Sequence, residues 1–119
     1  MTRVLIIDDQ PNFRRQLRLL LERAGFEVIA DVEDIISAEI LLGEEQPDLA
    51  IVDVLLGDAS GIEGTLRLKT LAPKMRVILT SAYRDNNLQT SAKAVGAEAF
   101  IPKDALDLSI VLSWDKKKE

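Results

Sequence analysis

The chain has 119 residues, of which 47% are hydrophobic and only 4% aromatic, and its 20 acidic and 15 basic residues give a net charge of -5. This length suits one domain with an aliphatic core, and the negative charge argues against nucleic acid as a direct partner. The lack of cysteine and histidine excludes disulfides, thiolate chemistry and the commonest general base. Because no apolar stretch approaches the ~20 residues that span a bilayer, we expect a cytoplasmic protein without a membrane segment.

Short apolar runs alternate with longer segments of helical period, which is typical of a parallel sheet covered by helices. The predicted strands cover residues 4–7, 27–30, 49–52, 77–80 and 99–101. Three of them are continuous apolar runs, as expected for strands buried on both faces. The sequence therefore predicts an α/β fold.

Helices are predicted after each of these strands. Pro11 and Gly25 suit the first position and the end of the first helix, and the second covers residues 34–44. Ser60 has the spacing of a capping box at the start of the third, and Asp85 would cap the fourth.

The fifth helix, expected from about Asp104, carries apolar side chains around well over half of its circumference. One sheet face does not require so much apolar surface, so either neighbouring side chains or a partner would cover the excess. The segment from Asp115 to Glu119 is almost all charged and indicates a solvated helix end or the start of a linker.

Polar side chains follow four of the five predicted strands. They are Asp8 and Asp9, Asp53, Ser81 and Lys103. Because the carboxyl ends of parallel strands meet at one rim, these groups are expected to converge there. Hard oxygen ligands suit Mg²⁺, which would relieve the repulsion among the carboxylates, about 4 kcal/mol for two charges ~4 Å apart at an effective dielectric constant of ~20.

Phosphoryl chemistry fits the same set of groups. Lys103 and Ser81 could bind the oxygens of a phosphoryl group, and Asp53, alone at its strand end, could act as a nucleophile to form an aspartyl phosphate. Taken singly, each of these residues is better explained as a cap or turn residue. It is their joint occurrence that indicates a functional site.

Four motifs, in this order and spacing, resemble the receiver domain of two-component response regulators. They are IIDDQ at 6–10, PDLAIVDVLLGDASG at 47–61, VILTSA at 77–82 and AFIPKD at 99–104. The resemblance implies one receiver domain over residues 1–119 without an effector domain. It also implies the flavodoxin-like (CheY-like) doubly wound fold, with five helices and a five-stranded parallel sheet in the order 2-1-3-4-5.

The resemblance also implies a role for each site residue. Asp53 would be the phosphoacceptor and a metal ligand, Asp8 and Asp9 the acidic pair that holds Mg²⁺, and the backbone carbonyl of Leu55 the last protein ligand. Ser81 would turn towards the phosphoryl group, Lys103 would pair with it, and Phe100 would be the aromatic residue of the switch.

A histidine kinase or a histidine phosphotransfer protein is the implied phosphodonor, and since this chain has no histidine the donor must lie on another protein. The implied output face is formed by the fourth helix, the fifth strand and the fifth helix, where we also expect a homodimer or partner contact. Such a domain is a signalling module and not an enzyme, apart from its own phosphotransfer and dephosphorylation.

Several positions depart from the family's frequent pattern. Gly57 stands where many receivers have proline, which predicts a more flexible loop, and Asp104 also replaces a frequent proline. Leu55 and Tyr83 occupy positions that flank the path of the hydrolytic water, so we expect them to exclude it and prolong the phosphorylated state. Phe100 replaces a frequent tyrosine, so a switch there would work by packing alone.

Three other functions fit these residues less well. A haloacid-dehalogenase-like phosphatase generally needs an acid two residues after its nucleophile, where this chain has Leu55. A flavodoxin-like cofactor binder needs a phosphate-binding loop after the first strand, where this chain has only Asp-Asp-Gln-Pro. A pseudo-receiver would act by protein contact without phosphorylation, and the intact set of acidic, hydroxyl and lysine residues argues against it.

Overall fold

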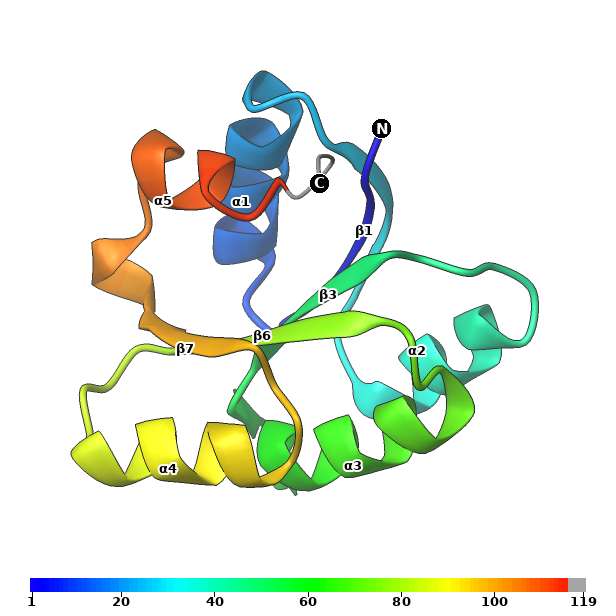
Figure 1. Ribbon diagram of the computed structural model, residues 1–119, viewed down its shortest axis with the longest axis vertical. Helices are drawn as coiled ribbons and strands as arrows, with labels where there is room; N and C mark the ends of the chain where they lie inside the picture. The colour runs from blue at the N-terminus through cyan, green and yellow to red at the C-terminus, as the bar shows by residue number, and fades with distance from the viewer. Residues whose placement is uncertain (116–119) are drawn as a thin grey trace.

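Five parallel strands form the central sheet of a computed structural model that describes residues 1–115 (Figure 1). The strands are β1 (Arg3–Ile7), β2 (Glu27–Val32), β3 (Leu49–Asp53), β6 (Arg76–Ser81) and β7 (Ala99–Pro102). Their order across the sheet is β2-β1-β3-β6-β7, which confirms the predicted 2-1-3-4-5 order of the parallel strands. The charged segment from Lys116 to Glu119 lies outside the described residues.

The helices cover both faces of this sheet (Figure 1). α1 (Pro11–Arg23) and α5 (Leu108–Leu112) lie on one face, and α2 (Ile35–Leu42), α3 (Gly61–Leu71) and α4 (Asn86–Ala94) lie on the other. Two aliphatic clusters result, because alternate residues of each strand point to opposite faces. No helix within residues 1–115 has the length and apolar character needed to cross a membrane.

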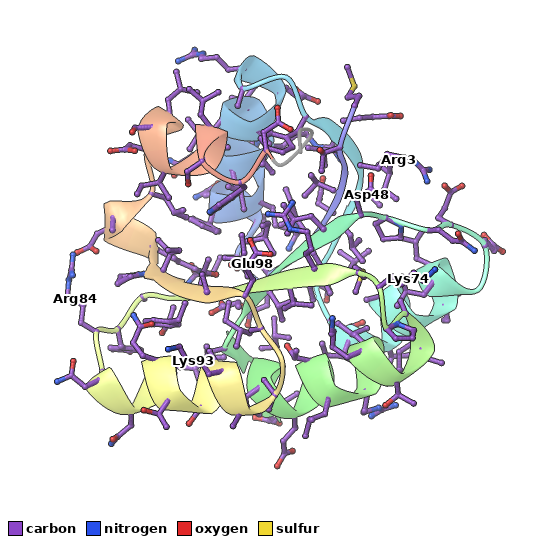
Figure 2. All side chains as sticks on the ribbon, in the orientation of Figure 1. Arg3, Asp48, Lys74, Arg84, Lys93 and Glu98 are labelled. Carbon is purple, nitrogen blue, oxygen red and sulfur yellow. The ribbon has the colours of Figure 1, made fainter. Side chains whose placement is uncertain are left out.

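The register between strands brings their carboxyl ends to one rim. At the opposite edge, where the strands begin, the Arg3 amide donates to Asp48 Oδ2 over 2.8 Å, and Figure 2 shows these two residues near each other. From there β1 and β3 pair in parallel without a shift of register, and Asp53 at the end of β3 pairs with Thr80 of β6. The residues that follow β1, β3, β6 and β7 are therefore delivered to the same edge.

The predicted helix caps of α3 and α4 are confirmed. The Ser60 hydroxyl accepts hydrogen bonds from the amides of Ile62 and Glu63, and the Asp85 carboxylate accepts one from the amide of Asn87. Each bond satisfies a backbone donor that the first helical turn leaves free.

The prediction for the start of the fifth helix was wrong. Residues Lys103–Ala105 form a single 3₁₀ turn, and α5 begins only at Leu108, where the Asp107 carboxylate caps the helix. Asp104 and Asp107 are both of a residue type that caps helices, and only Asp107 caps α5. Much of the apolar excess is covered by the fold itself, since Val111 and Trp114 are buried in the cluster between α1, α5 and the sheet.

A short hairpin that the sequence did not predict follows directly after Asp53. β4 (Leu55–Leu56) pairs antiparallel with β5 (Ala59–Ser60), and the chain reverses at Gly57, whose φ is +63°. At the base of the hairpin the Gly61 amide donates to the Val54 carbonyl over 2.7 Å. A Cβ on Gly61 would lie 1.9 Å from the carbonyl oxygen of Asp53, so only glycine allows this close approach.

Candidate functional site

Three carboxylates meet at the carboxyl edge of the sheet. Asp8 and Asp9 follow β1 and Asp53 ends β3, and one oxygen of each lies within 4.8 Å of the other two. Asp8 and Asp53 are only 1% and 4% exposed, whereas Asp9 is open to solvent. The structure therefore brings together the three residues that the sequence nominated as metal ligands.

Lys103 supplies the balancing positive charge. Its Nζ lies 2.8 Å from Asp8 Oδ2 and 3.3 Å from Asp53 Oδ2, so the side chain of this first residue of the 3₁₀ turn reaches the carboxylates at the ends of β1 and β3. The same ammonium donates to Gln10 Oε1 over 2.9 Å and lies 4.2 Å from the centre of the Phe13 ring. Four groups from two strand ends and the start of α1 thus fix its position.

The charges around Asp53 leave its carboxylate in an unfavourable environment. Burial raises the pKa of Asp53, and the neighbouring Asp8 charge raises it further. The Lys103 ammonium and the Leu55 amide, which donates to Asp53 Oδ1 over 3.3 Å, oppose this effect without cancelling it. An additional cation at the rim would favour the ionised form of Asp53.

The donor set fits a hard divalent cation. Asp8 Oδ2 is buried and accepts no hydrogen bond of good geometry from the described residues, although the Lys103 ammonium lies beside it. A carboxylate oxygen in this state is available as a ligand, and carboxylate oxygens are the ligands that Mg²⁺ prefers. A cavity of about 220 Å³ opens beside this group. It is lined by Asp9, Gln10, Asp53, Leu55, Gly57, Ala82, Tyr83 and Lys103.

The remaining predicted residues lie at different distances from this centre. Ser81 ends β6, next to β3, and its buried hydroxyl accepts a hydrogen bond from the Tyr83 amide over 3.0 Å. Leu55 and Tyr83 line the cavity with side chains that are 51% and 64% exposed. Phe100 is 4% exposed and packs in the cluster on the α2, α3 and α4 face, so it belongs to the core and not to the rim.

Sequence reasoning missed three contributors to the site. Gln10 was noted only as part of the IIDDQ motif and Phe13 was given no role in the site, although both contact Lys103. Gly57 was assigned only a flexible loop, yet its amide donates to Asp9 Oδ2 over 3.0 Å. Gln10 directly follows the acidic pair, and this adjacency was the one available indication.

Comparison with known proteins identifies the family. The family model described as the response regulator receiver domain matches residues 4–111. The chain belongs to this family. Receiver domains are signalling modules that interact with histidine kinases, and this one carries an acidic cluster compatible with the metal site that the family typically uses.

Relatives of this receiver domain include short and longer proteins. Protein CcdB of Bacillus subtilis is 34% identical over 87% of the chain and 86% of the relative, and chemotaxis protein CheY of the same organism is 32% identical over 85% and 84%. A putative transcriptional regulator of Pseudomonas aeruginosa is 32% identical over 87% of the chain, which spans only 50% of that relative.

Two solved structures show the same fold. A response regulator receiver domain protein (CheY-like) from Methanospirillum hungatei has a TM-score of 0.83 and 26% identity, covering 95% of this chain and 89% of that one. A response regulator from Burkholderia pseudomallei, crystallised with a phosphorylated aspartic acid, a calcium ion and citrate, has a TM-score of 0.85 and 27% identity. The match covers 95% of this receiver domain and 65% of the Burkholderia chain.

Proposed function

We propose that this receiver domain accepts a phosphoryl group on Asp53 from a partner histidine kinase or histidine phosphotransfer protein. The observation that carries the proposal is the Lys103 ammonium, which bridges the buried carboxylates of Asp8 and Asp53 beside an open cavity. An acidic cluster without a lysine could bind a metal ion but would offer no cation of its own to a phosphoryl group. A lysine fixed against the acceptor carboxylate can also bind an oxygen of a transferred phosphoryl group.

In the proposed transfer, an oxygen of ionised Asp53 attacks the phosphorus of the donor phosphohistidine. The P–N bond breaks, its electron pair returns to the imidazole, and the donor histidine takes up a proton from solvent as it leaves. The Lys103 ammonium and the Ser81 hydroxyl are placed at neighbouring strand ends, where they would donate hydrogen bonds to the new phosphoryl oxygens. Because Asp53 is already desolvated, its carboxylate needs little reorganisation to react.

Asp8, Asp9 and Asp53, with the backbone carbonyl of Leu55, would hold Mg²⁺ in this reaction. When bound, the cation neutralises charge on the carboxylates and on the phosphoryl oxygens. The phosphorylated aspartate and the calcium ion named for the Burkholderia relative support this assignment by analogy.

The proposed output face consists of α4, β7 and α5. Phosphorylation would draw the Ser81 hydroxyl away from the Tyr83 amide and towards the new oxygens, which changes the packing around Phe100 on the adjacent strand. A homodimer or partner contact on this face remains a prediction, and it rests on fewer free apolar side chains than the sequence indicates, since Trp114 is buried.

The decisive experiment is incubation with Mg²⁺ and acetyl phosphate, followed by intact mass spectrometry. We expect one added phosphoryl group on the natural chain and none on Asp53→Ala. Asp58→Ala is the matched control, because Asp58 is an exposed carboxylate in the neighbouring hairpin and should label normally. A natural chain that gains no phosphoryl mass would support the pseudo-receiver alternative, and equal labelling of Asp53→Ala would refute the assignment of the acceptor.

A phosphatase of similar topology is the less favoured alternative. The position two residues after Asp53 is Leu55, whose apolar side chain lines the cavity where such an enzyme needs an acid. Leu55 and Tyr83 would instead exclude water and give a phosphorylated state that hydrolyses slowly. Rapid loss of phosphate that is unchanged in Leu55→Asn would contradict this part of the proposal.

A further inference from the structure

The hairpin after Asp53 is tied at its tip to the acidic pair on another strand. The Gly57 amide donates to Asp9 Oδ2 over 3.0 Å, although the two residues are 48 positions apart in the chain. At its base the hairpin begins at Asp53 itself, with the Val54 amide bonded to the Thr80 carbonyl and the Gly61 amide bonded to the Val54 carbonyl. The hairpin therefore connects the acceptor carboxylate to the exposed carboxylate of the cluster.

The backbone of Gly57 has the conformation that this contact requires. Its φ of +63° lies in the left-handed region, which glycine adopts freely, asparagine tolerates and proline cannot reach. Proline would also lack the N–H that binds Asp9. A Cβ at Gly57 would meet no atom within 4 Å, so the position demands this backbone conformation and not a small side chain.

The orientation of the Asp9 carboxylate depends on the Gly57 amide, whereas the carboxylates of Asp8 and Asp53 are held by other groups. Asp8 is buried and held by the Gln10 amide at 2.9 Å, and Asp53 is held by Lys103 and the Leu55 amide. Asp9 is exposed, and within residues 1–115 its carboxylate accepts a hydrogen bond only from the Gly57 amide. Since a carboxylate oxygen pair has about four acceptor positions, the bond to Oδ2 leaves Oδ1 free for a cation.

We infer that Gly57 is a positioning residue for the divalent cation, acting through Asp9. Its amide fixes the Asp9 carboxylate in the orientation that completes the three-carboxylate cluster, so that cation binding and hairpin conformation are coupled. The inference rests on the proposed use of Mg²⁺ at this site, and it adds the Gly57 amide to the groups that position the metal ligands. A replacement that removes the Gly57 N–H should weaken cation binding roughly tenfold, the lower end of the effect seen when a group that orients a metal ligand is lost.

The test compares two substitutions that differ in the N–H and in φ. Gly57→Asn keeps the amide and tolerates φ near +63°, so it should bind Mg²⁺ nearly as tightly as the natural chain in an NMR titration of ¹⁵N-labelled protein. Gly57→Pro loses the amide N–H and cannot adopt the positive φ, so it should bind Mg²⁺ about tenfold more weakly than the natural chain. Gly25→Asn is the matched control, because Gly25 also has a positive φ and open space at its Cβ but lies at the end of α1.

Amide exchange provides a readout that does not depend on whether Gly57→Pro folds. In the natural chain without Mg²⁺, the Gly57 amide should exchange at least several-fold more slowly than in Asp9→Ala. Equal exchange rates in these two proteins, equal Mg²⁺ affinity of Gly57→Pro and the natural chain, or equal weakening by Asn and Pro would each overturn the inference. Failure of phosphorylation by acetyl phosphate would refute the proposed function alone, since neither readout here involves a phosphodonor.

Discussion

Replacing Asp53 by asparagine is expected to make the unphosphorylated protein more stable, although Asp53 is the proposed centre of its activity. A ligand oxygen of the buried Asp8 lies within 4.8 Å of that of Asp53, so these two charges repel by at least about 3.5 kcal/mol at an effective dielectric constant of ~20. Lys103, 3.3 Å away, attracts Asp53 by about 5 kcal/mol on the same scale. Burial of the charge is the largest cause of the raised pKa of Asp53, and together with the Asp8 repulsion it outweighs this attraction, so Asp53→Asn should be more stable by on the order of 1 kcal/mol.

The pH dependence of this gain follows from the raised pKa of Asp53. A carboxyl group whose pKa is higher in the folded state than in the unfolded state does not oppose folding while it is protonated, below about pH 4. As the pH rises through the folded-state pKa, ionisation is less favourable in the folded protein, and stability is lost. The advantage of Asp53→Asn should therefore be large at neutral pH and small in acid.

Urea denaturation monitored by the fluorescence of the single tryptophan measures this difference, because Trp114 is buried in the folded state. Asp58→Asn, which neutralises an exposed carboxylate in the hairpin, is the control and should change little. Saturating Mg²⁺ should reduce the difference in the free energy of unfolding between the two proteins, because it stabilises the natural chain more than Asp53→Asn. A variant that is no more stable at neutral pH, or an advantage that is the same at pH 4 and pH 7, would show that the electrostatic reasoning is wrong.

Three further predictions concern groups around the site. Gln10→Met removes the acceptor 2.9 Å from Lys103 Nζ and should slow labelling by acetyl phosphate roughly tenfold, since a hydrogen bond to a charged group is worth about 1.5 kcal/mol. Thr80→Val should raise the free energy of unfolding by about 1 kcal/mol, because the Thr80 hydroxyl is buried without a hydrogen-bond partner among the described residues. Burial opposes ionisation of Asp31, but two neighbouring arginines outweigh it and lower its pKa. Their stabilising effect is present at neutral pH and lost as the pH falls through that pKa, so denaturation of Asp31→Asn should show a deficit that narrows in acid.

The sequence was sufficient for the sheet, because each strand contains a short apolar stretch near turn residues, and the carboxyl ends of β1, β3, β6 and β7 carry the polar groups of the site. It was insufficient where the outcome depends on contacts between distant segments. The two-residue strands of the hairpin are too short to show any periodicity. The contacts of Gln10 and Phe13 with Lys103 join the two ends of the chain, 93 positions apart in the case of Gln10, and no local pattern indicates them. The strand order itself came from the family resemblance, since the hydrophobic pattern does not distinguish between arrangements of buried strands.

Repulsion among the clustered carboxylates lowers the stability of the folded protein, and the same repulsion favours binding of a cation. Three carboxylates lie close together, and the Lys103 ammonium contacts only the buried pair, Asp8 and Asp53, which cannot be solvated by turning outwards. A cation that binds only the folded chain relieves the repulsion between the carboxylates. The free energy that this repulsion costs the folded protein therefore contributes to the affinity for the cation. Stability gained by neutralising one of the three carboxylates should therefore reappear as a comparable loss of cation affinity. In the proposed mechanism, binding of a cation or transfer of one phosphoryl group to Asp53 would relieve this repulsion, and the free energy released would be available to shift the conformation of the rim.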